Sequence, residues 1–202
     1  LVDEVDGALW TPSSLEACHS EKLPELDRIV VAIDPPTTSK SGSDECGIVV
    51  SGIRMQGELR DWRAVVLEDC SMSAASPSAW ATAAISAMEK HGADQLIAEV
   101  NQGGEMVEQV VRQIDPLVPF KSVHASRGKS ARAEPVAALY EQGRVLHTRG
   151  LDAPEEQMCA MTRTGYEGKG SPDRVDALVW ALTELMLVPA AKWRHPRVRS
   201  VY

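Results

Sequence analysis

Three acidic residues stand where the surrounding sequence is apolar. Asp34 ends the run 29–33, Glu99 interrupts the run 96–100, and Asp176 lies beside the apolar stripe of the last predicted helix. An ionised carboxylate in such surroundings is costly unless it is paired with a cation or bound to a metal ion. Carboxylates suit Mg²⁺ or Mn²⁺, and two such ions can activate water for phosphodiester cleavage. The three acids together therefore predict metal-assisted hydrolysis of a phosphate ester.

Each acid also has a purely structural explanation. Asp34 precedes Pro35 and fits a turn, and Glu99 fits a salt bridge with an arginine. Asp173 lies one turn before Asp176, where the first turn of a helix favours an acid through the macrodipole. Convergence of the acids at one edge of the fold favours a metal site over these separate explanations.

The elements that must position these acids predict an α/β domain. Residues 28–34 are apolar on both faces, which is typical of a central strand covered on both sides. The pattern then predicts a hairpin of strands 46–53 and 59–69 with its turn near Gly57. Further predicted strands are 95–100, 118–123 and 144–147, and predicted helices are 13–18, 77–91, 104–114, 133–142 and one from Ser171 that ends at Pro189.

This order predicts a mixed sheet of five or slightly more strands with helices on both faces. Parallel strands bring their carboxyl ends to one edge of a sheet, where ligands bind in open α/β folds. Asp34 and Glu99 are therefore expected to face each other, with the last helix bringing Asp176 alongside.

Composition limits the class of protein. The 202 residues, 44% of them hydrophobic, suit one α/β domain. The net charge of −8 argues against a nucleic-acid partner, but residues 121–149 hold six Lys and Arg against two Glu. A local basic stripe matters more for phosphate binding than the total charge. No apolar run approaches the roughly 18 residues of a membrane span, and the N-terminus lacks the pattern of a secretory signal, so we expect neither membrane insertion nor secretion.

Several other motifs carry little weight. The four cysteines are scattered without a CxxC pair, and the five histidines show no metal-ligand spacing, which argues against a structural zinc site and favours surface or hydrogen-bonded roles for the histidines. Residues 127–130 resemble the end of a phosphate loop, but the glycine that this loop requires would fall at Val123, so ATP hydrolysis is not expected. Residues 101–104 fit an anion site or tight packing equally well.

Five ordered blocks together resemble a known family, the C-terminal nuclease domain of the large terminase subunit of tailed bacteriophages and related gene transfer agents. These blocks are residues 29–36, 44–50, 98–104, 132–145 and 171–182. The resemblance covers about residues 28–188, which implies a lead-in or linker over 1–27 and a basic tail over 189–202.

The resemblance implies an RNase H-like fold and a two-metal endonuclease that cleaves concatemeric double-stranded viral DNA during genome packaging. By position it implies that Asp34, Glu99 and Asp176 are catalytic and bind two Mg²⁺ or Mn²⁺ ions. Asp173 is a further candidate metal ligand. The roles of Asp44 and Glu45, in a loop that approaches the same edge, stay open.

The resemblance also implies partners. Lys121, Arg127, Lys129 and Arg132 are candidates for contacts with the DNA backbone, although a solvated basic face explains them equally well. Implied protein partners are the small terminase subunit, the portal and an ATPase domain of the same polypeptide, in the host cytoplasm and transiently at the procapsid portal. Alternatives are a junction resolvase or RNase H-type hydrolase of the same fold, and a non-catalytic docking module that divalent metal would not stabilise.

Overall fold

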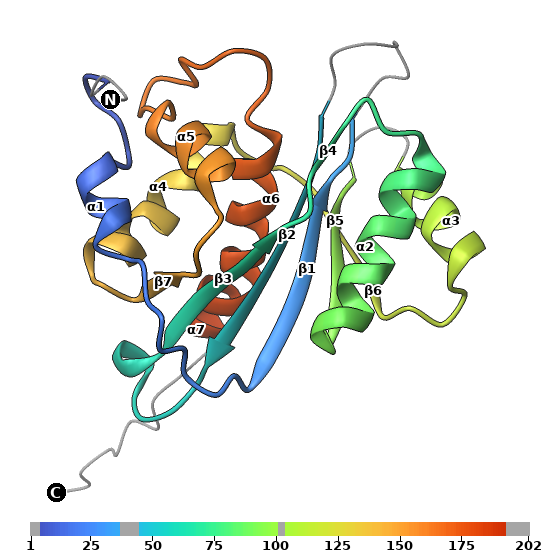
Figure 1. Cartoon of the computed structure of the whole chain (residues 1–202), viewed down its shortest axis with the longest axis horizontal. Helices are drawn as coiled ribbons and strands as arrows, with labels where there is room; N and C mark the ends of the chain where they lie inside the picture. Colours follow the sequence, from blue (N-terminus) through green and yellow to red (C-terminus); the bar gives the residue numbers. More distant parts are fainter. Residues whose placement is uncertain (1–4, 37–44, 101–103, 193–202) are drawn as a thin grey trace, which may run out of the picture.

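A mixed sheet forms the centre of the molecule. The computed structural model describes residues 5–36, 45–100 and 104–192, so Asp44, residues 101–103 and most of the predicted basic tail lie outside the described residues. Within these ranges one seven-stranded sheet has helices on both faces (Figure 1). The predicted mixed α/β architecture is confirmed.

The strand order places the predicted acids at one edge. The strands are β1 (Arg28–Asp34), β2 (Glu45–Arg54), β3 (Arg63–Asp69), β4 (Met72–Ser73), β5 (Gln95–Glu99), β6 (Phe120–Val123) and β7 (Val145–His147). Their order is β6-β5-β1-β2-β3-β7, with β4 paired to β2 beside this row. β2 is antiparallel to its neighbours, whereas β1 and β5 are parallel. The carboxyl ends of β1 and β5 therefore lie side by side.

The helices form two layers. They are α1 (Pro12–Glu16), α2 (Pro77–His91), α3 (Gly104–Ile114), α4 (Lys129–Glu141), α5 (Asp152–Cys159), α6 (Asp173–Leu182) and α7 (Val188–Lys192), with a 3₁₀ turn η1 (Leu59–Asp61) and a π-helical turn η2 (Thr183–Leu187). Figure 1 shows α2 and α3 on one side of the sheet and α1, α4, α5 and α6 on the other. No helix in the described ranges is long and apolar enough to cross a membrane.

Alternation along β1 builds a core on each face of the sheet. Val30 and Ala32 belong to the core under α6, and Val31 and Ile33 belong to the core under α2. All four side chains are fully buried. A strand with period-2 alternation can be apolar throughout only when both faces are covered, as the sequence predicted.

Several predicted boundaries differ from the structure. Residues 59–61 form η1 instead of a strand, because the Asp61 carboxylate accepts a hydrogen bond from the Glu58 amide at 3.0 Å and closes a turn. The last helix does not end at Pro189, because η2 precedes it and Pro189 falls in the first turn of α7. A missing N–H is tolerated at the start of a helix. The sequence analysis also missed α5.

The described part of the segment interpreted as a lead-in packs on the domain. Trp10 and Leu15 are 1% and 2% exposed and belong to the core under α6. The Trp10 ring meets Tyr140 of α4 edge to face, with ring centroids 5.8 Å apart. Such an edge-to-face contact stabilises the fold in addition to the stabilisation from the apolar area that the rings bury. The part of this segment around Trp10 and Leu15 is therefore held against the helical layer that carries α6.

Candidate metal centre

Three acids from β1 and α6 form one cluster of oxygen atoms. Carboxylate oxygens of Asp34, Asp173 and Asp176 lie within 4.8 Å of one another. Asp34 is half-buried at the end of β1, and the other two are buried in the first turn of α6. The helix packs across β1 and β2, and its one-turn spacing directs both of its acids toward the strand end.

Gly47 on β2 permits this close approach. It pairs with Asp34 in the sheet, and a Cβ atom at Gly47 would lie 2.0 Å from the backbone carbonyl oxygen of Asp173. No other residue leaves room for the start of α6 at this point. The sequence analysis did not assign Gly47 a role, although a glycine inside an apolar strand is itself a signal of close backbone approach.

Gly47→Ala tests this explanation. We expect the variant to lose about 1–3 kcal/mol of unfolding free energy, since overpacking forces the backbone to shift, and to bind Mn²⁺ more weakly because the shift moves Asp173. Urea unfolding and calorimetric titration with Mn²⁺ measure both effects. The matched control is Gly92→Ala, whose added Cβ meets no atom within 4 Å; that position has a positive φ and loses stability through backbone strain, without loss of Mn²⁺ affinity. Equal Mn²⁺ affinity in Gly47→Ala and the parent would contradict the explanation.

Glu99 lies at the same edge but is joined to the cluster through a cation. The parallel register pairs Ile33 with Ala98, so Asp34 and Glu99 follow at the next positions of adjacent strands. Arg132 of α4 donates to Glu99 at 2.8 Å and to Asp176 at 3.1 Å. The arginine pairing considered for Glu99 from the sequence is thus present, and it links Glu99 to the acids of α6.

The aromatic ring of Trp180 supports this bridge. Its indole N–H donates to the Glu99 carboxylate, and the Arg132 guanidinium carbon lies 4.8 Å from the ring centroid. The Arg132 side chain is only 10% exposed. A cation over an aromatic face in a desolvated setting is held electrostatically as well as by its hydrogen bonds. Trp180 therefore orients one acid and one cation.

Lys129 supplies the second positive charge. Its ammonium nitrogen lies 2.5 Å from Asp176 Oδ2 and 4.0 Å from Asp173 Oδ1, and it donates to the Ser171 hydroxyl at 2.9 Å. α4 starts at Lys129, four residues earlier than expected, since Gly128 provides the extended N-cap. The helix therefore places both Lys129 and Arg132, one turn apart, over the acids.

Within the described residues, Lys129 and Arg132 do not fully offset the negative charge of the acids. Burial raises the pKa of the Asp34 carboxyl well above its usual range, and the charges of Asp176, Glu99 and Asp173 raise it further, against a smaller opposite effect of Lys129. Burial also raises the pKa of Asp176, although Lys129 and Arg132 act to lower it. The cluster therefore favours additional positive charge, and its all-oxygen donor set fits a hard divalent cation.

Comparison with known families shows which family the chain belongs to. Residues 31–185 match the family described as the terminase RNase H-like domain. The chain belongs to this family. A comparison with curated protein sequences found no match.

Solved structures share the fold of this terminase domain. The large terminase nuclease of thermophilic phage G20c, with bound magnesium, superposes with a TM-score of 0.62 at 14% identity, over 90% of this chain and 99% of that one. The P22 large terminase nuclease domain gives 0.62 at 13% identity, over 87% and 93%. The human cytomegalovirus terminase nuclease domain gives 0.55 at 17% identity, over 91% and 98%. The expected RNase H-like fold is confirmed.

The four basic residues expected to contact DNA do not share one environment in the terminase domain. Lys129 and Arg132 face the acids, whereas Lys121 forms an ion pair with Glu184 of η2 at 2.6 Å. Arg127 is exposed in the loop before α4. Their contacts with DNA stay a prediction. The side chains of Lys121 and Lys129 are 36% and 43% exposed, whereas that of Arg132 is only 10% exposed.

Glu45 has a structural partner. Its carboxylate accepts from the Arg174 guanidinium at 2.6 and 2.9 Å, and Arg174 also pairs with Asp69. Arg174 follows Asp173 in the first turn of α6, so Glu45 ties that turn to the start of β2. Asp44, the other loop acid, lies outside the described residues.

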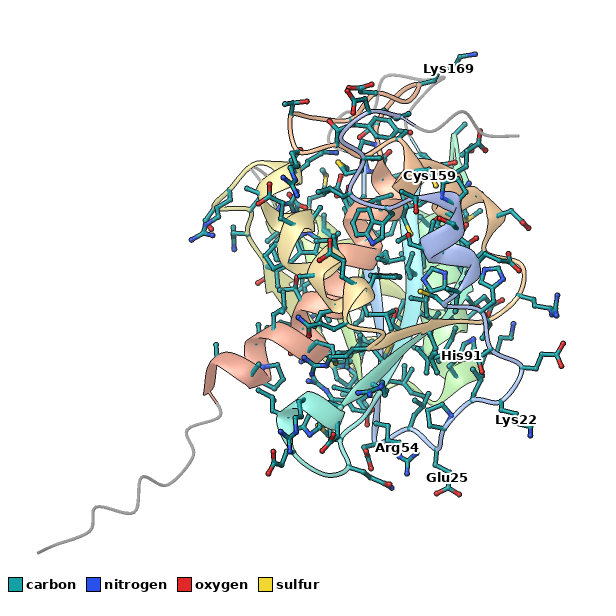
Figure 2. All side chains as sticks on the ribbon, turned by 90° about the vertical axis from the view of Figure 1, so that its left-hand side faces the viewer. Lys22, Glu25, Arg54, His91, Cys159 and Lys169 are labelled. Carbon is teal, nitrogen blue, oxygen red and sulfur yellow. The ribbon has the colours of Figure 1, made fainter. Side chains whose placement is uncertain are left out.

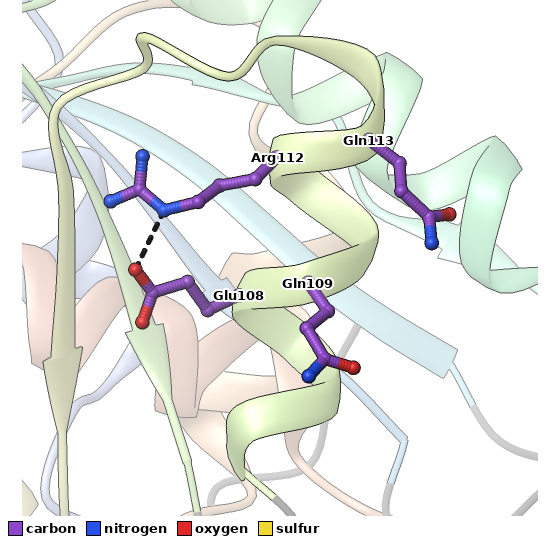
Figure 3. Close-up of a pocket in the computed structure, with 4 residues that line it drawn as sticks. All are labelled: Glu108, Gln109, Arg112 and Gln113. Carbon is purple, nitrogen blue, oxygen red and sulfur yellow. Dashed lines mark hydrogen bonds and ion pairs between the residues drawn. The ribbon is translucent and has the colours of Figure 1, made fainter.

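A pocket elsewhere on the terminase domain has different chemistry. A cavity of about 430 Å³ on α3 is lined by Glu108, Gln109, Arg112 and Gln113 (Figure 3). Arg112 pairs with Glu108 at 2.7 Å as an exposed neighbour one turn away. This pocket offers one paired acid, whereas the edge of β1 offers three converging ones, so the candidate site is the latter.

Proposed function

We propose that this terminase domain is the nuclease of a viral genome-packaging machine, which hydrolyses double-stranded DNA with two divalent metal ions, Mg²⁺ or Mn²⁺. The observation that carries the proposal is the cluster of Asp34, Asp173 and Asp176 oxygens at the carboxyl edge of the central strand. Membership of the terminase RNase H-like family supports the substrate class. Relatives solved with bound magnesium and with bound cobalt support a divalent cation.

The residues at the edge fit such ions. Asp34 would hold both ions, Asp176 and Glu99 would hold one each, and Asp173 stands beside Asp176 as a further ligand. When bound, the ions would supply the activation of water and the neutralisation of charge on the leaving oxygen. Because Asp34 and Glu99 end adjacent strands and Asp176 lies on a packed helix, the ligands are held by rigid elements before any ion arrives.

Lys129 and Arg132 would act on the substrate side of the same edge. In the structure they neutralise acids of the cluster, and divalent ions, when bound, would supply positive charge to the same acids. Lys129 and Arg132 would then offer their charge to phosphate oxygens of a DNA strand lying over the cluster. This exchange reconciles the acidic overall composition with a polyanionic substrate.

The wider assembly belongs to the same proposal. The chain covers 43% of the large terminase of thermophilic phage D6E, and we propose that an ATPase domain in the same polypeptide moves the DNA that this domain cuts. The small terminase subunit and the portal are the proposed further partners, and the proposed location is the host cytoplasm, transiently at the procapsid portal.

A substrate panel tests the proposal. The domain is incubated with supercoiled plasmid, a four-way junction and an RNA–DNA hybrid, in Mg²⁺, in Mn²⁺ and with a chelator. We expect plasmid cleavage that requires the divalent ion and exceeds cleavage of the other two substrates by on the order of tenfold or more, about 1.4 kcal/mol of discrimination. Preference for the junction or the hybrid would indicate the resolvase or RNase H alternative. A domain that neither cuts nor gains stability with Mn²⁺ would indicate a docking module.

A further inference from the structure

A second group of metal-ligand side chains lies three strands away from β1. It consists of His19 in the segment before β1, His147 at the end of β7 and Glu155 in α5. Donor atoms of the three residues lie within 4.8 Å of one another. His147 is fully buried, whereas the other two side chains are partly exposed, so the group opens to solvent on one side.

One carboxylate oxygen joins the two imidazoles. His19 Nε2 and His147 Nδ1 each lie 2.7 Å from Glu155 Oε1. The backbone holds the two histidines side by side independently of these contacts, since the His147 amide donates to the Cys18 carbonyl at 2.9 Å and the Ser20 amide donates to the His147 carbonyl at 3.0 Å. The two rings are stacked with centroids 6.2 Å apart. The ligand atoms are therefore positioned before any ion is added.

The outer nitrogens of both rings also face oxygen atoms. His147 Nε2 lies 2.7 Å from the hydroxyl of Tyr140, and His19 Nδ1 lies 4.0 Å from Glu16 Oε2. Metal-binding histidines usually have such an oxygen partner on the second nitrogen, which fixes the ring orientation and the tautomer. Here the partner of His147 is a buried tyrosine whose pKa burial raises well above its usual range, so it stays a hydroxyl.

We propose that His19 Nε2, His147 Nδ1 and Glu155 Oε1 form a Zn²⁺ site that fastens the segment before β1 to β7 and α5. Two imidazoles and one carboxylate, with a fourth position open to water, are a common zinc ligand set. Tetrahedral zinc with these ligands separates its donor atoms by about 3.3 Å. The present spacing of 2.7 Å needs only a small opening, which the partly exposed His19 and Glu155 side chains can provide.

The ligands of this site are far apart in the sequence, so they show no metal-ligand spacing. His19 and His147 come from opposite ends of the domain, and only the pairing of the first segment with β7 brings them together. Both histidines have hydrogen bonds, as the sequence predicted. In the proposed site, a Zn²⁺ ion takes the place of the protons between the imidazole nitrogens and Glu155. The site is independent of the acids at β1, so its failure would leave the proposed nuclease function intact.

Metal titration of the whole chain tests the proposal. The protein is stripped with a chelator and then titrated with Zn²⁺ in millimolar Mg²⁺, which is added to compete for the acidic cluster. We expect about one Zn²⁺ per chain, a rise in Tm of roughly 5–10 °C at saturating zinc, and slower tryptic cleavage at Lys22. With Co²⁺ in place of Zn²⁺ we expect the visible absorption of a tetrahedral site.

Matched variants distinguish a zinc site from a hydrogen-bonded clasp, in which His19, His147 and Glu155 are joined by hydrogen bonds alone. Zinc affinity should fall at least about 100-fold in His19→Ala and in Glu155→Gln, and stay unchanged in Asp34→Asn. The control is His91→Ala, because His91 contacts Glu68 at 2.6 Å in a similar pair that belongs to neither compact group of three metal-ligand side chains among the described residues. Figure 2 shows His91 well apart from Cys159, the last residue of α5. His19 is partly exposed in a loop, so its variant should fold. Absence of zinc binding in the parent, or equal binding in His19→Ala, would overturn the proposal and leave a hydrogen-bonded clasp only.

Discussion

Asp34→Asn is expected to abolish DNA cleavage and, in the absence of divalent ions, to make the domain more stable. Asparagine keeps the shape of the side chain and removes its charge. Cleavage should fall by on the order of 1,000-fold or more, since Asp34 is the ligand proposed to serve both ions. Stability should rise because the charge of Asp34 is repelled by Asp176, Glu99 and Asp173 in a buried setting.

The pH dependence gives this prediction a definite sign. The folded pKa of Asp34 is raised above its ordinary value of 3.8, so the folded state holds the proton more tightly than the unfolded state. Between about pH 3.8 and the folded pKa, the folded state keeps the proton on Asp34 whereas the unfolded state has lost it. The unfolding free energy therefore falls as the pH rises through this range. Asp176 acts in the same direction. The advantage of Asp34→Asn should be greatest above the folded pKa and vanish toward pH 3.8.

Urea unfolding at several pH values, with a chelator and with Mn²⁺, measures both parts. The parent should gain stability from Mn²⁺ and the variant should gain little, so the order of their stabilities reverses when the metal is added. Asp94→Asn is the control, since the Asp94 carboxylate accepts a hydrogen bond from the Ile29 amide, at the opposite end of β1 from Asp34. If Asp34→Asn cut DNA at the parental rate, or responded to Mn²⁺ as the parent does, the assignment of Asp34 would be wrong.

Much of the fold is encoded in local sequence patterns. Residues 28–34 are apolar on both faces, and the structure covers both faces of that strand. The signals at Ser76 and Gly92 mark the two ends of α2, because a hydroxyl cap and a residue in the left-handed conformation satisfy groups that the helix leaves free. The proline at position 189 predicted the end of the last helix, and this prediction failed. The π-helical turn η2 precedes Pro189, which therefore lies at the start of α7.

The acids of the candidate site were predicted for a similar reason, but the particular cations that pair with them were not. A carboxylate inside an apolar run is conspicuous from sequence alone, which pointed to Asp34 and Glu99. Arg132 and Lys129 belong to the basic stretch that predicted DNA contacts, and only the packing of α4 against α6 shows that they face the acids. Long-range pairing of charges leaves no periodic signal, and the same holds for His19 and His147.

Arg132→Ala is expected to be the most destabilising charge removal in the described part of the domain. Arg132 bridges Glu99 and Asp176, whose side chains are 6% and 3% exposed. Removing one partner of a buried pair leaves an uncompensated buried charge, which costs about 3–5 kcal/mol. Loss of the contact with the Trp180 ring adds to this cost. Urea unfolding in a chelator should therefore show a large fall in unfolding free energy.

A surface pair provides the matched control. Arg112 pairs with Glu108 one turn away at 2.7 Å, but both side chains are about two-fifths exposed. Arg112→Ala should cost no more than about 0.5 kcal/mol, since exposed pairs on a helix are screened by solvent. A fall in Arg132→Ala that is no larger than in Arg112→Ala would mean that Lys129 alone compensates the two buried acids.

Divalent metal should restore part of the stability of Arg132→Ala and none of that of Arg112→Ala. The ions bring positive charge to the carboxylates that the guanidinium no longer neutralises, whereas nothing at the surface pair binds them. The stability that Mn²⁺ restores to Arg132→Lys should lie between that restored to Arg132→Ala and that restored to Arg112→Ala. An ammonium keeps the charge but cannot contact both acids with the planar fork of a guanidinium. A rescue by Mn²⁺ that grows from Lys to Ala at position 132 would show that arginine and metal neutralise the same acids, and that the ion-free domain depends on α4 for the charge that the bound ions would otherwise provide.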